Sequence, residues 1–206
     1  NFYPGESGGT AVFNSIFASN GAVPSGKLPY TWYRRGFVQQ RGAPNDQDLR
    51  HGLGQTYRYY TGDLVLLPFA HGLSYSNLSF YFVDKPSATV APGEVLEKGL
   101  SLKVEVANAG PYATDAIVTV FAALSGPLTD HCPRQTLAQF DRVRVAVGAS
   151  AQVQLNLNAR QLACVDDNGV ASVIGGNSTL TLTVGEVGAE LKTEILLEGA
   201  TVALPR

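Results

Sequence analysis

The sequence predicts a mainly β protein, in which an antiparallel β-sandwich follows an incomplete α/β segment. Alternating apolar and polar residues recur along the later part of the chain, and Gly, Pro, Asn and Asp divide these runs at short intervals. The earlier part offers roughly one helix and one strand, too few elements to close a core of their own. We place the boundary after Tyr75, which gives the segments 1–75 and 76–206.

The first segment opens with one amphipathic run. Four apolar residues recur there at helical spacing: Val12, Phe13, Ile16 and Phe17. Asn20-Gly21 supplies a helix stop, and residues 27–33 indicate an extended stretch with Pro29 at its edge or end. The polar, Gly-containing residues 34–56 predict a long loop. We therefore expect 1–75 to need covering structure from outside this chain.

The second segment carries the period of half-buried strands. The runs that lead to this prediction lie at 100–106, 117–121, 152–158, 180–184 and 195–197. Asp166-Asp-Asn-Gly169 is typical of a tight turn between two strands. We expect Asp166 and Asp167 to serve that turn rather than to form a catalytic pair.

Bulk composition excludes some partners. The 206 residues are 45% hydrophobic and 16% charged, with a net charge of −2, which predicts a folded chain without the clustered Lys and Arg that nucleic acid or an anionic membrane requires. No apolar run reaches the length of a membrane span. The chain starts at Asn1 and contains no Met, so we expect a processed product or a piece of a longer polypeptide.

Two cysteines and two sequons favour the secretory pathway. Cys132 and Cys164 then predict a disulfide, although two small buried hydrophobes are the alternative. The sequons predict a glycan on Asn77 or Asn177. On these grounds we expect a secreted, extracellular protein.

Several separate motifs, in order, resemble the C-terminal region of glycoside hydrolase family 3, which contains β-xylosidases, β-glucosidases and α-L-arabinofuranosidases. They are Tyr3-Pro-Gly-Glu-Ser-Gly-Gly9, Pro24-Ser-Gly-Lys-Leu-Pro29, Thr56-Tyr-Arg-Tyr-Tyr-Thr-Gly62 and Pro68-Phe-Ala-His-Gly-Leu-Ser-Tyr75. The third run is most like the β-xylosidase and arabinofuranosidase branch. By this resemblance, 1–75 ends an α/β sandwich domain and 76–206 is a fibronectin type III-like, immunoglobulin-like domain. Ala70 stands where the family usually has Gly.

The resemblance implies an accessory role. The family's nucleophilic Asp lies in an upstream barrel, in a Ser-Asp-Trp-type motif, and the acid/base Glu of this branch lies before the Tyr-Pro-Gly loop. The only Trp here is Trp32, so we expect no catalytic residue in this chain. The expected function is the C-terminal structural part of a secreted enzyme that hydrolyses terminal β-linked sugars, partnered by its upstream catalytic domains and its glycan substrate. The alternative is a non-catalytic structural or glycan-contacting module in an extracellular or multi-protein assembly.

Few residues remain as site candidates. Glu6, in the Gly-rich loop before the first helix, and Tyr3 beside it are the candidates to lie near substrate, although a loop carboxylate attracted by the helix dipole is the alternative for Glu6. The sequence offers no metal or cofactor motif, and its three histidines are scattered: His51, His71 and His131. Tyr57 and Tyr59 alternate in what we interpret as an extended segment, where core packing is favoured over stacking on sugars.

Overall fold

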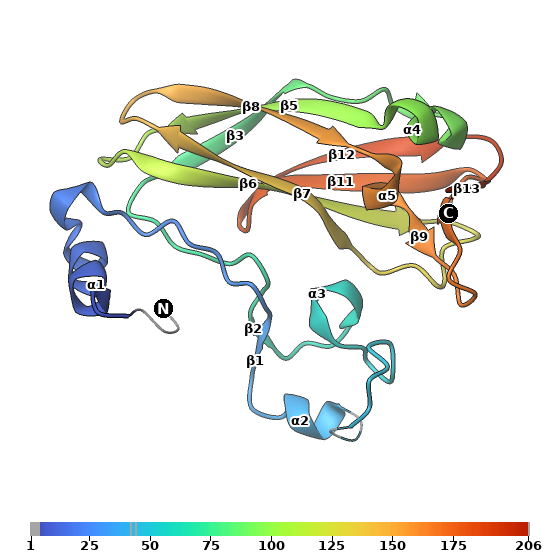
Figure 1. Cartoon of the computed structure of the whole chain (residues 1–206), viewed down its shortest axis with the longest axis horizontal. Coiled ribbons are helices and arrows are strands. Elements are labelled where there is room, and N and C mark those ends of the chain that lie inside the picture. Colours follow the sequence, from blue (N-terminus) through green and yellow to red (C-terminus); the bar gives the residue numbers. More distant parts are fainter. Residues whose placement is uncertain (1–4, 42, 44, 206) are drawn as a thin grey trace.

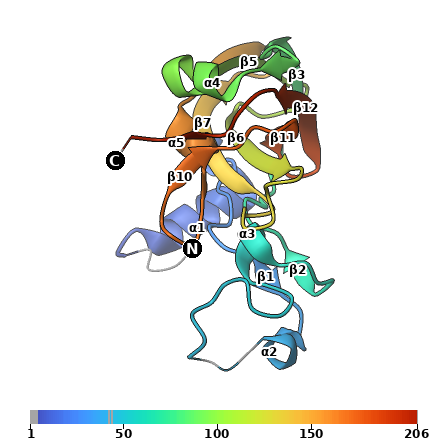
Figure 2. The same cartoon turned by 90° about the vertical axis from the view of Figure 1, so that its right-hand side faces the viewer.

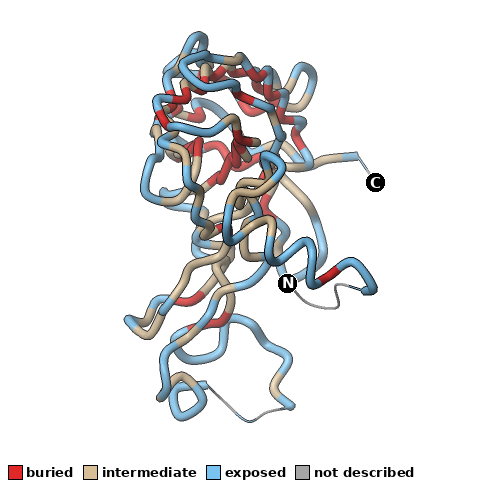
Figure 3. Tube along the Cα trace, turned by 90° about the vertical axis from the view of Figure 1, so that its left-hand side faces the viewer, coloured by how far each residue is buried: buried red, intermediate tan, exposed pale blue. Residues whose placement is uncertain are grey.

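The structure is a computed structural model that describes residues 5–41, 43 and 45–205. Its mainly antiparallel β architecture matches the predicted fold class. Figure 1 shows the β-sandwich in the upper half of the view and the first segment extending below it. Figure 3 shows that buried residues gather in the sandwich, whereas the first segment is largely exposed.

Two sheets form the sandwich. A five-stranded sheet has the order β4-β12-β11-β6-β7, and a three-stranded sheet has the order β3-β5-β8. Their strands are β3 (Leu78–Asp84), β4 (Thr89–Val90), β5 (Leu100–Asn108), β6 (Thr114–Ser125), β7 (Thr136–Val145), β8 (Ser150–Leu157), β11 (Ser178–Glu186) and β12 (Ala189–Leu197). All neighbours pair antiparallel except β4, which runs parallel to β12. Four of the five predicted runs lie within one of these strands, and the fifth, 152–158, extends one residue past the end of β8.

Alternation along the strands builds the core between the sheets. In β5, Leu102, Val104 and Val106 are fully buried, while the residues between them are partly or fully exposed. Leu155 of β8 and Leu182 of β11 are fully buried in the same cluster. Because side chains of a strand alternate between its faces, this pattern fixes the register of each strand. The sandwich therefore has a continuous apolar core of its own.

Two short helices and a small sheet close one end of the sandwich, and the sequence analysis did not predict the helices. These elements are α4 (Pro92–Lys98), α5 (Ala159–Leu162), β9 (Cys164–Val165), β10 (Ala171–Val173) and β13 (Val202–Ala203). Helix α4 starts on a proline and ends before Gly99, whose φ is +69°. A side chain at Gly99 would meet the carbonyl oxygen of Leu157 at 2.2 Å, so this position favours glycine.

The first segment contains more helical turns than predicted. Its elements are α1 (Gly8–Phe17), the 3-10 turn η1 (Ser19–Gly21), β1 (Trp32–Tyr33), α2 (Phe37–Gln40), α3 (Thr56–Tyr59) and β2 (Val65–Leu67). Helix α1 ends where Ala18 adopts a left-handed conformation, two residues before the predicted stop. The interpretation of Tyr57 and Tyr59 as extended was wrong, because they lie on the helical turn α3. Helix α2 falls inside the predicted loop.

The apolar face of α1 is left exposed by the part of the chain that the structure describes. Within residues 5–41, 43 and 45–205, four side chains that the sequence placed on one helical face are 40–66% exposed: Val12, Phe13, Ile16 and Phe17. Among the described residues, no helix is both long and apolar enough to cross a membrane.

Aromatic and charged contacts hold the first segment against the sandwich. Alternate residues of β6 face the core, and Phe121 instead faces outward, where Tyr57 and Phe69 cover it at ring distances of 5.8 and 6.0 Å. Lys27 forms a nearly buried ion pair with Glu186 of β11, with Nζ to Oε2 at 2.9 Å. Figure 2 shows α2 and the β1–β2 pair at the end far from the sandwich.

The backbone conformation of Ala70 explains why the family that the sequence resembles usually has Gly at this position. Its φ is +65°, in the left-handed region, and its side chain is buried. The Ala70 N–H donates to the carbonyl of Leu28 at 2.8 Å, and the N–H of Leu28 donates to the carbonyl of His71 at 2.8 Å. These two bonds tie the extended stretch before β1 to the chain after β2, so the strained residue lies at a fixed junction.

Candidate functional site

The residues expected near substrate stand apart from the buried parts of the chain. Glu6 is exposed, just before the first turn of α1, and it makes no hydrogen bond or ion pair with any residue that the structure describes. Tyr3 lies outside the described residues. The role of both near substrate therefore stays a prediction.

Of the two carboxylates that the sequence assigned to the turn at 166–169, that of Asp166 serves the turn and that of Asp167 forms an ion pair. The Asp166 carboxylate accepts N–H bonds from Val170 and Asn168 at 2.8 and 2.9 Å. These bonds, that from Val170 first, hold the pKa of Asp166 below its usual value. The turn interpretation of Asp166 is confirmed, and its neighbour Asp167 pairs with Arg50 of the first segment at 3.2 Å.

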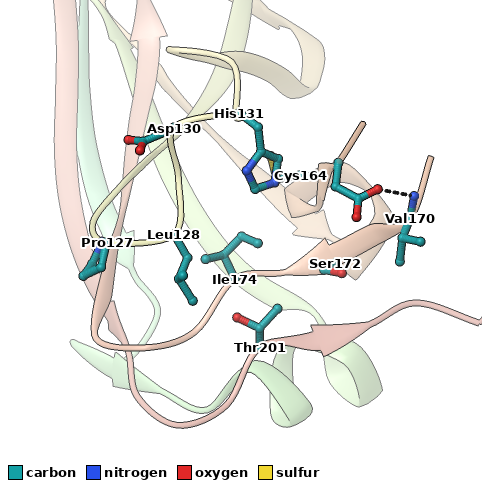
Figure 4. A pocket seen from close by; sticks show the side chains of 10 residues that line it. Pro127, Leu128, Asp130, His131, Cys164, Val170, Ser172, Ile174 and Thr201 are labelled. Carbon is teal, nitrogen blue, oxygen red and sulfur yellow. Dashed lines mark hydrogen bonds between the residues drawn. The ribbon is translucent and has the colours of Figure 1, made fainter. Parts of the chain in front are cut away.

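A disulfide joins Cys132 to Cys164, with Cα atoms 5.4 Å apart. His131 lies close to both sulfur atoms, but a disulfide leaves no thiolate to bind a metal. Beside the disulfide is an open hollow of about 350 Å³, lined by loop residues that include Asp130 and Thr201 and by Ser172 of β10 (Figure 4). The Asp166 carboxylate at its wall already accepts the two turn hydrogen bonds described above.

Two aromatic clusters lie in the first segment. Tyr33 stacks on Phe37 at 3.6 Å, and the ring of Tyr60 meets both edge-on. In the second cluster, Tyr57 stacks on Phe69 at 4.2 Å against the outer face of β6. The packing interpretation of Tyr57 is therefore confirmed, although its backbone is helical.

Between these clusters lies a cleft of about 300 Å³, which we call the aromatic cleft. Its walls are mostly apolar and are formed by Pro29, Tyr30, Thr31, Tyr33, Phe37, Leu49, Gln55, Thr56, Tyr57, Arg58 and Phe69. Three polar atoms at this cleft are buried and have no hydrogen-bond partner among the described residues: Thr31 Oγ1, the Tyr33 hydroxyl and Arg58 Nε. Burial raises the pKa of Tyr33, and the Thr56 backbone N–H and the Thr31 side chain, which approach its hydroxyl without full hydrogen-bond geometry, oppose the rise.

Sequence reasoning did not find the aromatic cleft, because its walls come from separate stretches between residues 29 and 69. The one available signal was Arg58, a cation inside the aromatic run from Tyr57 to Tyr60. Buried polar atoms in native proteins almost always have partners. Both surfaces therefore have the chemistry of a contact surface. The exposed face of α1 is apolar, and the cleft combines apolar walls with a few polar atoms that lack hydrogen-bond partners.

Comparison with known proteins places these surfaces in context. The family model of the fibronectin type III-like domain matches residues 117–186, inside the sandwich. A probable exo-1,4-β-xylosidase of Aspergillus oryzae is 31% identical over 199 residues, covering 89% of this chain and 24% of that protein. β-D-xylosidase 1 of Arabidopsis thaliana is 29% identical, covering 95% of this chain and 28% of that protein. The chain thus spans about a quarter of the length of these relatives.

Solved structures agree on the fold. The GH3 exo-β-xylosidase XlnD, in complex with a xylobiose aziridine activity-based probe, matches with a TM-score of 0.86 at 23% identity, covering 99% of this chain and 28% of that one. A β-glucosidase from Erythrobacter marinus matches with a TM-score of 0.73 at 27% identity, covering 95% of this chain and 24% of that one. Both matches include the first segment as well as the sandwich.

Proposed function

We propose that this chain, which is homologous to the C-terminal part of glycoside hydrolase family 3 β-xylosidases, is the non-catalytic portion that completes and braces such an enzyme. In this proposal, 1–75 docks on catalytic structure that precedes it in a longer polypeptide, and 76–206 supports that contact from outside. The whole protein would remove terminal β-linked sugars from glycans by a retaining mechanism with two carboxylates.

The exposed face of α1 is the observation that carries the proposal. Phe13 and Phe17 are 55% and 66% exposed, and their tilted rings lie 4.8 Å apart, which makes an apolar patch that a free-standing domain would bury. The sandwich itself has a closed core and needs no such cover. The first segment is thus held on one side by the sandwich and offers its other apolar side to a partner.

Bracing would contribute to catalysis by keeping the catalytic groups of the docked domains in position. Catalytic groups displaced by about 1 Å lose on the order of a hundredfold in rate. The ion pair between Lys27 and Glu186 and the cover over Phe121 tie the first segment to a rigid sandwich. Catalytic structure docked on that segment would therefore be held in position by the sandwich as well.

Secretion is part of the proposal. The disulfide between Cys132 and Cys164 and the exposure of Asn77 and Asn177 support it. Peptide masses from native material are expected to carry a glycan at one of these asparagines. Unmodified masses at both would count against secretion.

The docking test compares the 206-residue chain with the full polypeptide. Phe13→Ser and Phe17→Ser together are expected to leave the unfolding midpoint of the short chain nearly unchanged, because both rings are exposed there. In the full polypeptide the same pair is expected to lower the midpoint and to reduce kcat/KM on an aryl β-xyloside. Phe140→Ser, at a 63% exposed site on β7, is the matched control and should change neither.

Two outcomes contradict the proposal. One is turnover of the aryl β-xyloside by the pure 206-residue chain. The other is a full polypeptide that hydrolyses neither aryl β-xylosides nor aryl β-glucosides.

A further inference from the structure

We propose that the aromatic cleft receives an Asp or Glu side chain from the catalytic part of the longer polypeptide, so that Arg58 gains its carboxylate partner across the domain contact. The inference rests on the proposed function for the existence of that upstream part. It adds one specific ion pair to the contact between the first segment and the upstream part, separate from the apolar face of α1.

The cleft offers hydrogen-bond donors without acceptors. Arg58 Nε is a donor only, and the hydroxyls of Thr31 and Tyr33 each have a proton to donate. All three atoms are buried, and none makes a hydrogen bond of normal geometry with a described residue, although the Tyr33 hydroxyl lies near the Thr31 side chain and the Thr56 backbone. An ionised carboxylate is the matching group, because it only accepts, and its two oxygens provide about four lone-pair sites.

The charge around the cleft points the same way. Arg58 forms no ion pair within the described part of the chain, and its guanidinium lies over the ring of Tyr59 at 5.7 Å. Of the three acids in residues 29–69, Asp46 pairs with His51 and Asp48 with Arg50, and the exposed Asp63 forms no ion pair with Arg58. Residues 29–69 contain five Arg and three Asp, a net charge of +2 in a chain whose total is −2. An acidic partner complements this surface.

The setting of the cleft favours a protein side chain as its occupant. The cleft lies in the first segment, which extends below the sandwich in Figure 2. The relatives contain about three-quarters of their length beyond the matched region. A carboxylate on a short apolar stem would place carbon against the aromatic walls and its oxygens toward the Arg58 guanidinium, beside the side chains of Thr31 and Tyr33.

Arg58→Met is the first test, made in both the full polypeptide and the 206-residue chain. The unfolding midpoint of the full polypeptide is expected to fall by roughly 3–5 °C, because an upstream carboxylate loses its partner. In the 206-residue chain the midpoint is expected to stay or rise, since a half-buried cation without an ion pair is removed. Arg160→Met on α5 is the matched control and should act alike in both.

The partner is then identified by double-mutant cycles in the full polypeptide. Upstream Asp and Glu residues are changed singly to Asn and Gln and combined with Arg58→Met. One of them is expected to be non-additive with Arg58→Met by about tenfold in the unfolding equilibrium constant. Tyr33→Phe should weaken the same coupling, whereas Tyr81→Phe on the exposed face of β3 should leave it unchanged.

Three results would overturn the inference. Arg58→Met could act equally in both proteins, or no upstream acid could couple to it. Glucuronate or acetate could bind the full polypeptide in an Arg58-dependent manner, which would assign the cleft to a soluble carboxylate. Loss of glycosidase activity has no bearing on these readouts, so an inactive full polypeptide would refute the proposed function and leave the inferred ion pair standing.

Discussion

Replacing Phe121 by Ala tests how the first segment is held on the sandwich. The ring is 9% exposed although it faces away from the core, because Tyr57 and Phe69 cover it. Phe140 lies on the neighbouring strand β7, opposite Thr119 in register, and is 63% exposed. Phe140→Ala is therefore a control with the same chemistry on the same sheet.

The expected magnitude follows from burial. Removal of a buried Phe side chain costs about 3–5 kcal/mol when the cavity cannot close. We expect about 3 kcal/mol for Phe121→Ala, because Tyr57 and Phe69 belong to a covering segment that can settle toward the sheet. Phe140→Ala should change the free energy of unfolding by less than about 0.5 kcal/mol.

Two probes separate the two parts of the chain in one urea titration. Trp32, the only tryptophan, reports on the first segment, and far-ultraviolet circular dichroism reports mainly on the sandwich strands. With a slope of about 2 kcal/mol/M, Phe121→Ala should lower the Trp32 midpoint by about 1–2 M and the dichroism midpoint by less. The reasoning is refuted if both midpoints of Phe121→Ala equal those of Phe140→Ala.

Three further predictions concern strain, charge and the disulfide. Ala70→Gly should raise the free energy of unfolding by about 1 kcal/mol, measured in urea, because it relieves a left-handed backbone; a decrease would refute this. The hydrogen bond from Arg142 lowers the pKa of Asp115, so its stabilisation is complete above the unfolded-state pKa near 4 and is lost as pH falls through the lower folded-state value. Asp115→Asn should therefore flatten the decline in urea midpoint below about pH 4, and an unchanged slope would contradict this. Replacing Cys132 and Cys164 by Ala opens a loop with a sequence separation of 32 and should destabilise the chain by about 3–4 kcal/mol; free thiols in an unreduced peptide map would remove the basis of this prediction.

Sequence patterns predicted the sandwich because the alternation of buried and exposed residues is visible within each strand. A two-residue period identifies a half-buried strand without knowledge of its neighbours, as in the run from Leu100 to Val106. The exposed face of α1 was predictable for the same reason, since helical spacing grouped Phe13 with Phe17. The helices α4 and α5 were missed although each carried a signal: Pro92 at the first position of α4, and a capping box between Asn158 and Gln161 before α5.

The cleft was beyond sequence reasoning for a different reason. Thr31, Tyr33 and Arg58 are brought together by the β1–β2 pair and by the turn α3, whose Tyr57 packs against Phe121. Tertiary contact overrides local preference at Tyr57, where alternating aromatics suggested a strand and the chain forms a helical turn. Which polar atoms lack partners follows only from such a three-dimensional arrangement.

Mass spectrometry of the protein from its native source, intact and after digestion, tests the central claim most directly. We predict peptides that continue upstream of Asn1 into a domain with a Ser-Asp-Trp-type motif, or a copurifying upstream fragment of the same precursor. A protein that starts at Asn1 and purifies without any such fragment would contradict the account and leave the chain a non-catalytic module of another assembly.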